Sequence, residues 1–171
     1  RDLVRSRGLG DVYKRQRLTT GDVGNRYLFQ TLAQNGLNDL LYSMLNHYET
    51  PGYGFQLRHG ATTLTEQWDP NQGSSLNHFM MGQIDEWLFK TLAGIQNRPG
   101  TYGLRHLLIK PTLVGDLKYV NASTESLYGK ISVCCTRSSL TVDIPVGSDA
   151  TIVLPDGTEK QVGSGKHTFN F

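Results

Sequence analysis

The chain has 171 residues, of which 37% are hydrophobic, 9% aromatic and 19% charged. This composition excludes a wholly disordered chain and fits one domain or two small ones. No run approaches the roughly 18 consecutive apolar residues of a membrane helix, so we expect no membrane partner. Residues 1–17 contain six of the 17 basic residues and two of the 15 acidic ones, which leaves residues 18–171 with a net charge of −2 and argues against a nucleic-acid partner.

Residues 1–17 are predicted to be a non-native or disordered leader. They have neither helical nor strand periodicity, and the string GLGDVYKRQ at positions 8–16 looks like translated sequencing-adapter sequence. We therefore exclude them from the fold prediction and expect the chain to be a fragment of a longer protein.

Three amphipathic helices are predicted within residues 18–97. Apolar residues at helical spacing indicate one helix over 25–35, closed by Asn35 and Gly36, and a second over 37–45. A third is predicted to begin at Ser74 or Ser75, each a suitable N-cap, and to end near residue 95. Its apolar face is wide enough to require further helices around it.

The hydrophobic period changes from 3.6 to 2 after the linker at 97–100, which predicts a second domain, a β-sandwich, over residues 98–171. Cys134 and Cys135 are adjacent on one predicted strand, so we expect them to face opposite sides and not to bridge each other. The predicted strands are 106–110, 117–121, 129–136, 139–144, 150–154, 159–162 and 166–171.

The connection over residues 49–73 and the residues after it hold the candidate site, because loops of this length in compact domains are usually functional or disordered. Glu66 lies two residues before Trp68, so a carboxylate able to act as a base stands beside an indole able to stack on a sugar. Phe55 adds aromatic surface, and His78 follows at the predicted helix start. The alternative is structural: a solvated loop glutamate, a surface histidine and aromatic rings that pack the loop onto the helices.

Several other enzyme classes are disfavoured because the sequence lacks their characteristic motifs. It contains no phosphate-binding loop, dinucleotide-binding glycine cluster, metalloprotease helix or serine nucleophile elbow.

Several segments carry a family resemblance in their order and spacing. They are TGDVGNRYL at 20–28, GATTLTEQWD at 60–69, SLNHFMMG at 75–82, AGI at 93–95, IKP at 109–111, VGDL at 114–117 and SLYGKI at 126–131. Together they resemble the C-terminal part of bacterial α-L-rhamnosidases of glycoside hydrolase family 78.

The resemblance implies the last helices of an (α/α)6 barrel over residues 18–97, followed by an antiparallel β-sandwich over 98–171. It implies hydrolysis, with inversion, of terminal α-L-rhamnosides in rhamnose-containing oligosaccharides or glycosides, with Glu66 as general base and no cofactor or metal. Trp68 is expected to pack beside the sugar and His78 to hydrogen-bond a hydroxyl, with Phe55 on the same substrate-binding surface. Many members have Trp directly before the base, whereas this sequence has Thr65, which puts the shape of the sugar subsite in question.

The resemblance places the general acid on earlier barrel helices, so we expect the chain alone to be inactive. Two alternatives remain: a non-catalytic carbohydrate-binding or structural module in which the sandwich is the working part, and another (α/α)6 glycosidase or phosphorylase. The sequence leaves open whether the bacterial parent is periplasmic or secreted.

Overall fold

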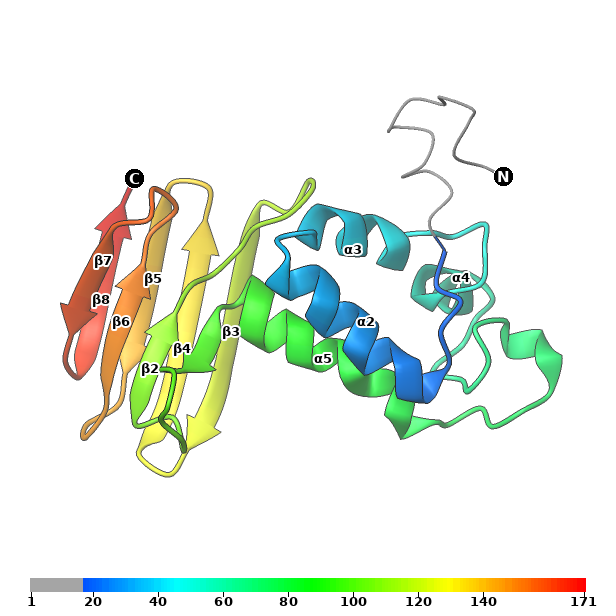
Figure 1. Ribbon diagram of the computed structural model, residues 1–171, viewed down its shortest axis with the longest axis horizontal. Coiled ribbons are helices and arrows are strands. Elements are labelled where there is room, and N and C mark those ends of the chain that lie inside the picture. Colours follow the sequence, from blue (N-terminus) through cyan, green and yellow to red (C-terminus); the bar gives the residue numbers. More distant parts are fainter. Residues whose placement is uncertain (1–16) are drawn as a thin grey trace. The chain divides into compact units, whose positions relative to one another are not determined.

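The computed structural model describes residues 17–171, so the predicted leader lies, apart from Arg17, outside the described residues. The chain forms two compact units that divide between Ile84 and Asp85, the first helical and the second mostly β (Figure 1). Among the described residues, no helix combines the length and apolar character that a bilayer crossing requires.

The first two predicted helices are confirmed as α2 (Asp22–Gln34) and α3 (Asn38–Leu45). The spacing of Tyr27, Leu28 and Leu32 predicts the helix, but its buried face is formed by Asn25, Phe29 and Leu32, and Tyr27 is 67% exposed. Gly36 has φ of 72°, a conformation that favours glycine, and it allows the chain to leave α2 and enter α3 within a few residues.

Two short elements interrupt the connection that follows α3. α4 (Tyr53–Arg58) is a six-residue helix, and η2 (Pro70–Gln72) is a single 3₁₀ turn. The carboxylate of Asp69 caps η2 by accepting the Asn71 N–H at 3.0 Å.

The prediction that the third helix begins at Ser74 or Ser75 is wrong. The helical segment begins only at Phe79, as the 3₁₀ helix η3 (Phe79–Gln83), and continues through α5 (Ile84–Trp87) and the π turn η4 (Leu88–Leu92). The Phe79 side chain is 86% exposed, so the apolar pattern at the predicted start does not correspond to a buried face.

The physical reason is that residues 75–78 hydrogen-bond to the loop before them. The Ser75 carbonyl accepts the Glu66 N–H at 2.9 Å, and the His78 N–H donates to the Leu64 carbonyl at 2.7 Å. Backbone groups that bond across the loop are not available to form a first helical turn.

The second unit contains two four-stranded sheets, ordered β1-β2-β6-β7 and β3-β4-β5-β8. Strands 129–136, 139–144 and 159–162 have the predicted bounds, and the strand predicted over 117–121 lies later and is longer. The strands are β1 (Ile95–Asn97), β2 (His106–Ile109), β3 (Tyr119–Ser126), β4 (Gly129–Thr136), β5 (Ser139–Ile144), β6 (Asp149–Val153), β7 (Glu159–Val162) and β8 (Gly165–Asn170).

All strand pairs are antiparallel except β2 with β6, which is parallel. The short strand β1 pairs with β2 although the sequence places the domain boundary after residue 97; the position of that boundary stays a prediction.

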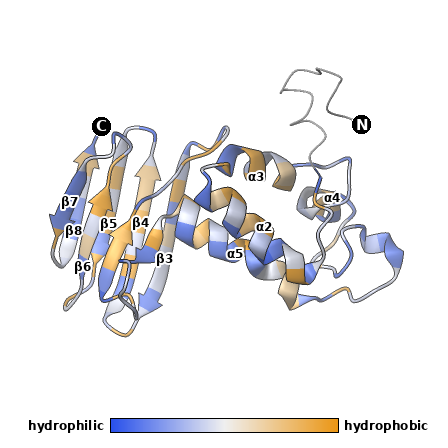
Figure 2. Ribbon diagram, viewed as in Figure 1, coloured by the Kyte–Doolittle hydropathy of each residue, from blue (hydrophilic) through white to orange (hydrophobic). Residues whose placement is uncertain are grey.

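Buried side chains from both sheets form one core, which makes the unit a sandwich. Alternate residues of β4 and β5 point inward, and β2 and β6 supply the facing side. The fully buried members of this core are Ala93, Leu107, Ile109, Ile131, Val133, Leu140, Val142, Ala150 and Ile152. Figure 2 shows hydrophobic stretches on β4, β5 and β6 and a hydrophilic β7, an edge strand whose charged residues discourage pairing with another sheet.

The two cysteines on β4 are free, with Cys134 exposed and Cys135 buried, as the strand alternation predicts. Burial, followed by the neighbouring Cys134 thiol, raises the pKa of Cys135 above its usual value.

Asp149 at the start of β6 joins the side chains of Arg98 and His106. It accepts a hydrogen bond from Arg98 and pairs with His106 of β2. Burial alone raises the pKa of Asp149, but the hydrogen bonds with His106 and Arg98 outweigh it and hold this pKa below the usual value.

Candidate active site

Glu66 is held against Ser75 through both its backbone and its side chain. Its N–H donates to the Ser75 carbonyl at 2.9 Å, and its Oε2 accepts the Ser75 N–H at 3.2 Å. With the His78 to Leu64 bond, these contacts place residues 64–66 beside residues 75–78. The structure therefore brings Glu66 and His78 onto adjoining segments.

The buried side of the same loop is organised by Gln56 of α4, whose side chain is 2% exposed. Its Oε1 accepts the Thr65 N–H at 3.4 Å, and its Nε2 donates to the carbonyls of Thr65 at 3.4 Å and Gln67 at 3.1 Å. The Thr65 hydroxyl also donates to the Gln67 carbonyl, at 2.7 Å. Thr65, the position that departs from the family pattern, is thus buried inside the loop.

Trp68 is fixed at its polar end and along its ring. Its Nε1–H donates to the Thr20 carbonyl at 2.8 Å, and the Tyr53 ring meets it edge-on with centroids 4.9 Å apart. Tyr53 in turn donates its hydroxyl to the Met81 carbonyl. A half-buried indole held in this way has little rotational freedom and presents an apolar face.

His78 is oriented by Asp22, the first residue of α2. Its Nε2 lies 3.2 Å from Asp22 Oδ2. The hydrogen bond with His78, and then the one from the Val23 N–H, hold the pKa of Asp22 below its ordinary value of 3.8. Nδ1 is therefore the ring nitrogen that faces away from the carboxylate and can serve a ligand.

Phe55 lies on α4, half-buried, and stacks on His59 one turn later, with ring centroids 3.9 Å apart. Among the described residues, the aromatic partners of Trp68 and His78 are Tyr53 and Phe79. The ring of Phe55 therefore stacks on neither Trp68 nor His78.

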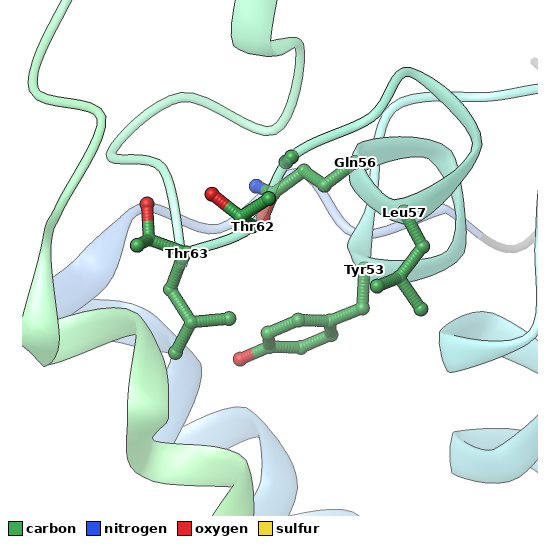
Figure 3. Close-up of a pocket in the computed structure, with 7 residues that line it drawn as sticks. Tyr53, Gln56, Leu57, Thr62 and Thr63 are labelled. Atoms are coloured by element: carbon green, nitrogen blue, oxygen red, sulfur yellow. The ribbon is translucent and has the colours of Figure 1, made fainter.

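A pocket of about 240 Å³ lies between α4 and residues 61–64. Figure 3 shows Tyr53, Gln56 and Leu57 of α4 around this pocket together with Thr62 and Thr63. None of Glu66, Trp68, His78 and Phe55 lines it, so the four predicted site residues lie around the loop rather than in this pocket.

The sequence analysis assigns no role to Gln56 or Asp22. Gln56 stands three residues after Tyr53, a spacing that places two residues on one face of a helix. The sequence analysis predicts no helix there, so the meaning of this spacing becomes clear only once α4 is known. Asp22 belongs to the TGDVGN segment, whose partner His78 is 56 residues away. Within the part of the chain that the structure describes, no cluster of three His, Cys, Asp or Glu side chains is placed to hold a metal ion.

The sequence matches two family models in succession. Residues 8–92 match the bacterial alpha-L-rhamnosidase 6 hairpin glycosidase domain, and residues 94–169 match the bacterial alpha-L-rhamnosidase C-terminal domain. The chain belongs to the bacterial α-L-rhamnosidase family. Its fold is that of a six-hairpin glycosidase domain followed by a β-sandwich, which confirms the fold that the resemblance implies.

Curated and solved α-L-rhamnosidases resemble this family member over nearly its whole length. An alpha-L-rhamnosidase of Streptomyces avermitilis is 30% identical and covers 89% of this chain, which spans 18% of that relative. The native enzyme of Aspergillus terreus superposes with a TM-score of 0.83 at 30% identity, over 90% of this chain and 20% of that one. The Streptomyces avermitilis enzyme complexed with L-rhamnose gives 0.84 at 27%, over 95% of this chain and 18% of that one.

Proposed function

We propose that this chain carries the base-bearing part of an inverting α-L-rhamnosidase that acts on terminal α-L-rhamnosides. The observation that supports this most directly is the Glu66 carboxylate, fixed by the Ser75 N–H on a segment beside His78, in a member of the rhamnosidase family. A relative solved with L-rhamnose supports the choice of sugar.

Inversion requires one carboxylic acid to protonate the leaving oxygen and a second carboxylate to activate a water on the opposite face. Glu66 is the second group. Because Oε2 accepts the Ser75 N–H, the carboxylate has a fixed direction, and Oε1 is the oxygen that takes the proton of the attacking water.

Trp68, His78 and Phe55 form the surface around the sugar in this proposal. The indole N–H of Trp68 is used by Thr20, so Trp68 contributes an apolar face and no donor. His78 binds a rhamnose hydroxyl through Nδ1, while Asp22 holds the ring. Phe55, half-buried and stacked on His59, contributes aromatic surface.

The general acid is supplied by barrel helices outside this chain, and the chain alone does not release rhamnose. In support, three other carboxylates of the described first unit already have local partners: Asp22 pairs with His78, Glu49 with Arg58, and Asp69 caps η2. The chain also spans only about a fifth of the relatives it matches. The reaction as written uses no cofactor.

The test measures L-rhamnose release from 4-nitrophenyl α-L-rhamnopyranoside. We expect none from the chain alone, and release from a chimera in which this chain replaces the matching part of the Streptomyces avermitilis enzyme. Glu66→Gln in the chimera lowers the rate about 100-fold or more, whereas the matched control Glu49→Gln, an exposed ion-pair residue, does not. Proton NMR of the first product anomer reads out inversion. Full activity of Glu66→Gln, or a retained anomer, would refute the proposal.

A second candidate, non-catalytic sugar binding by the sandwich, is favoured by one observation. A cavity of about 510 Å³ in the second unit is lined by Lys110, Thr136, Arg137 and Phe171 among others, which combines polar groups with an aromatic ring. Rhamnoside binding that is lost in Phe171→Ala and unaffected by Glu66→Gln would support it over the first.

A further inference from the structure

We infer that Gln56 is a positioning residue for Glu66: its buried amide fixes the peptides on both sides of Glu66 and so sets where the carboxylate stands. The inference rests on the proposed role of Glu66 as general base.

The amide of Gln56 bonds to the residue before Glu66 and to the residue after it. It meets both backbone groups of Thr65 and also donates to the Gln67 carbonyl at 3.1 Å. Glu66 lies between these anchors, and its own N–H and Oε2 are bonded to Ser75 on the other side. The base is therefore held from a buried side by Gln56 and from an exposed side by Ser75.

Burial makes these contacts hard to exchange for water. Gln56 and Thr65 are 2% and 3% exposed. If the amide is removed, the Thr65 N–H loses its partner where water does not readily replace it, and the loop must shift to satisfy that group. A displacement on the order of 1 Å is enough to lower a catalytic rate about 100-fold, because the carboxylate must reach the proton of the attacking water.

Two substitutions separate the donor and acceptor roles of the amide. Gln56→Met keeps the length of the side chain and removes both roles. Gln56→Glu keeps an acceptor for the Thr65 N–H at every pH. It regains one donor toward the Thr65 and Gln67 carbonyls only when its carboxyl is protonated, so low pH restores a donated bond and high pH abolishes it. Leu41→Ala is the matched control, since Leu41 is fully buried in α3 of the same unit and lies outside the loop.

The experiment measures amide hydrogen exchange by NMR on the full 171-residue chain. In Gln56→Met we expect the Thr65 and Glu66 amides to exchange about tenfold faster, as the loss of one hydrogen bond implies, while the Phe29 amide in α2 stays within about twofold. In Gln56→Glu, protection of the two loop amides returns toward wild type as the pH falls. In Leu41→Ala, the amides of α2 and α3 accelerate at least as much as the loop amides.

Three results would overturn the inference: loop exchange within twofold of wild type in Gln56→Met, equal acceleration of Phe29 and the loop in that variant, or loop protection in Gln56→Glu that, relative to wild type at the same pH, does not change with pH. If Gln56→Met does not fold, the pH dependence of Gln56→Glu decides the question. These readouts need no rhamnoside, so failure of Glu66→Gln to affect hydrolysis in the chimera refutes the proposed function and leaves the positioning result intact. Where the chimera is active, Gln56→Met lowers kcat about tenfold or more and leaves KM within about twofold.

Discussion

Replacing Gly94 by alanine should strongly destabilise the sandwich unit. Gly94 lies between η4 and β1 with φ of 71°, and its carbonyl accepts the Lys110 N–H at 3.0 Å. A Cβ at this position would lie 2.2 Å from the Lys110 carbonyl carbon and 2.2 Å from the Pro111 nitrogen. Both are backbone atoms, so no side-chain rotation relieves the overlap.

The magnitude has two parts. The left-handed conformation costs a non-glycine residue about 1–2 kcal/mol, and the displacement of close-packed backbone adds about 1–3 kcal/mol. The free energy of unfolding should therefore fall by about 2–5 kcal/mol. Gly100→Ala isolates the first part, because Gly100 has φ of 78° and no atom beyond its own residue and its two chain neighbours lies within 4 Å of the added carbon.

The assay is denaturant unfolding followed through the methyl NMR signals of buried Val133 and Val142, which report on the sandwich alone. The reasoning is refuted if Gly94→Ala costs no more than Gly100→Ala.

Three further outcomes are expected. The depressed pKa of Asp149 stabilises the second unit above about pH 4, and this stabilisation is lost as the pH falls through the lowered folded-state pKa. Asp149→Asn should therefore flatten the acid side of a plot of unfolding free energy against pH. An unchanged acid side would contradict this. Trp68→Phe removes the donor to the Thr20 carbonyl and should lower the stability of the first unit by about 1–2 kcal/mol in thermal unfolding, whereas a neutral result would mean that the bond is not maintained in solution. Iodoacetamide should label exposed Cys134 well before buried Cys135, as peptide mass mapping measures, and equal rates would count against the burial of Cys135.

Hydrophobic periodicity predicts the parts of this fold whose burial is local. α2 and the strands 129–136 and 139–144 follow from apolar spacing alone, because each has one face against a core. Leu76 and Phe79 extend the apolar pattern and so predict too early a start for the third helix, while the hydrogen bonds that keep residues 75–78 out of the helix come from residues 63–66. Spacing carries no information about such partners.

The candidate site divides in the same way. Glu66, Trp68 and His78 come from the order of motifs in the sequence, and their roles stay predictions. Gln56 and Asp22 are recognised only through their contacts, with partners 9–11 residues away for Gln56 and 56 for Asp22. In the sequence, nothing distinguishes a glutamine on a six-residue helix or an aspartate at a helix start from other such residues. Their hydrogen bonds in the folded chain identify them.

The parallel pairing of β2 with β6 constrains the order in which the sandwich forms. His106 and Asp149, which are partners in its register, are 43 residues apart, and the strands β3, β4 and β5 lie between them in sequence. Closing so long a loop has an entropic cost before any contact compensates it, whereas β3-β4 and β4-β5 are joined by tight turns. The β3-β4-β5 meander should therefore fold first, and β6 then pairs with β2 in the other sheet. Until β6 has been synthesised on the ribosome, β1 and β2 lack the strand that links them to β7 in their four-stranded sheet.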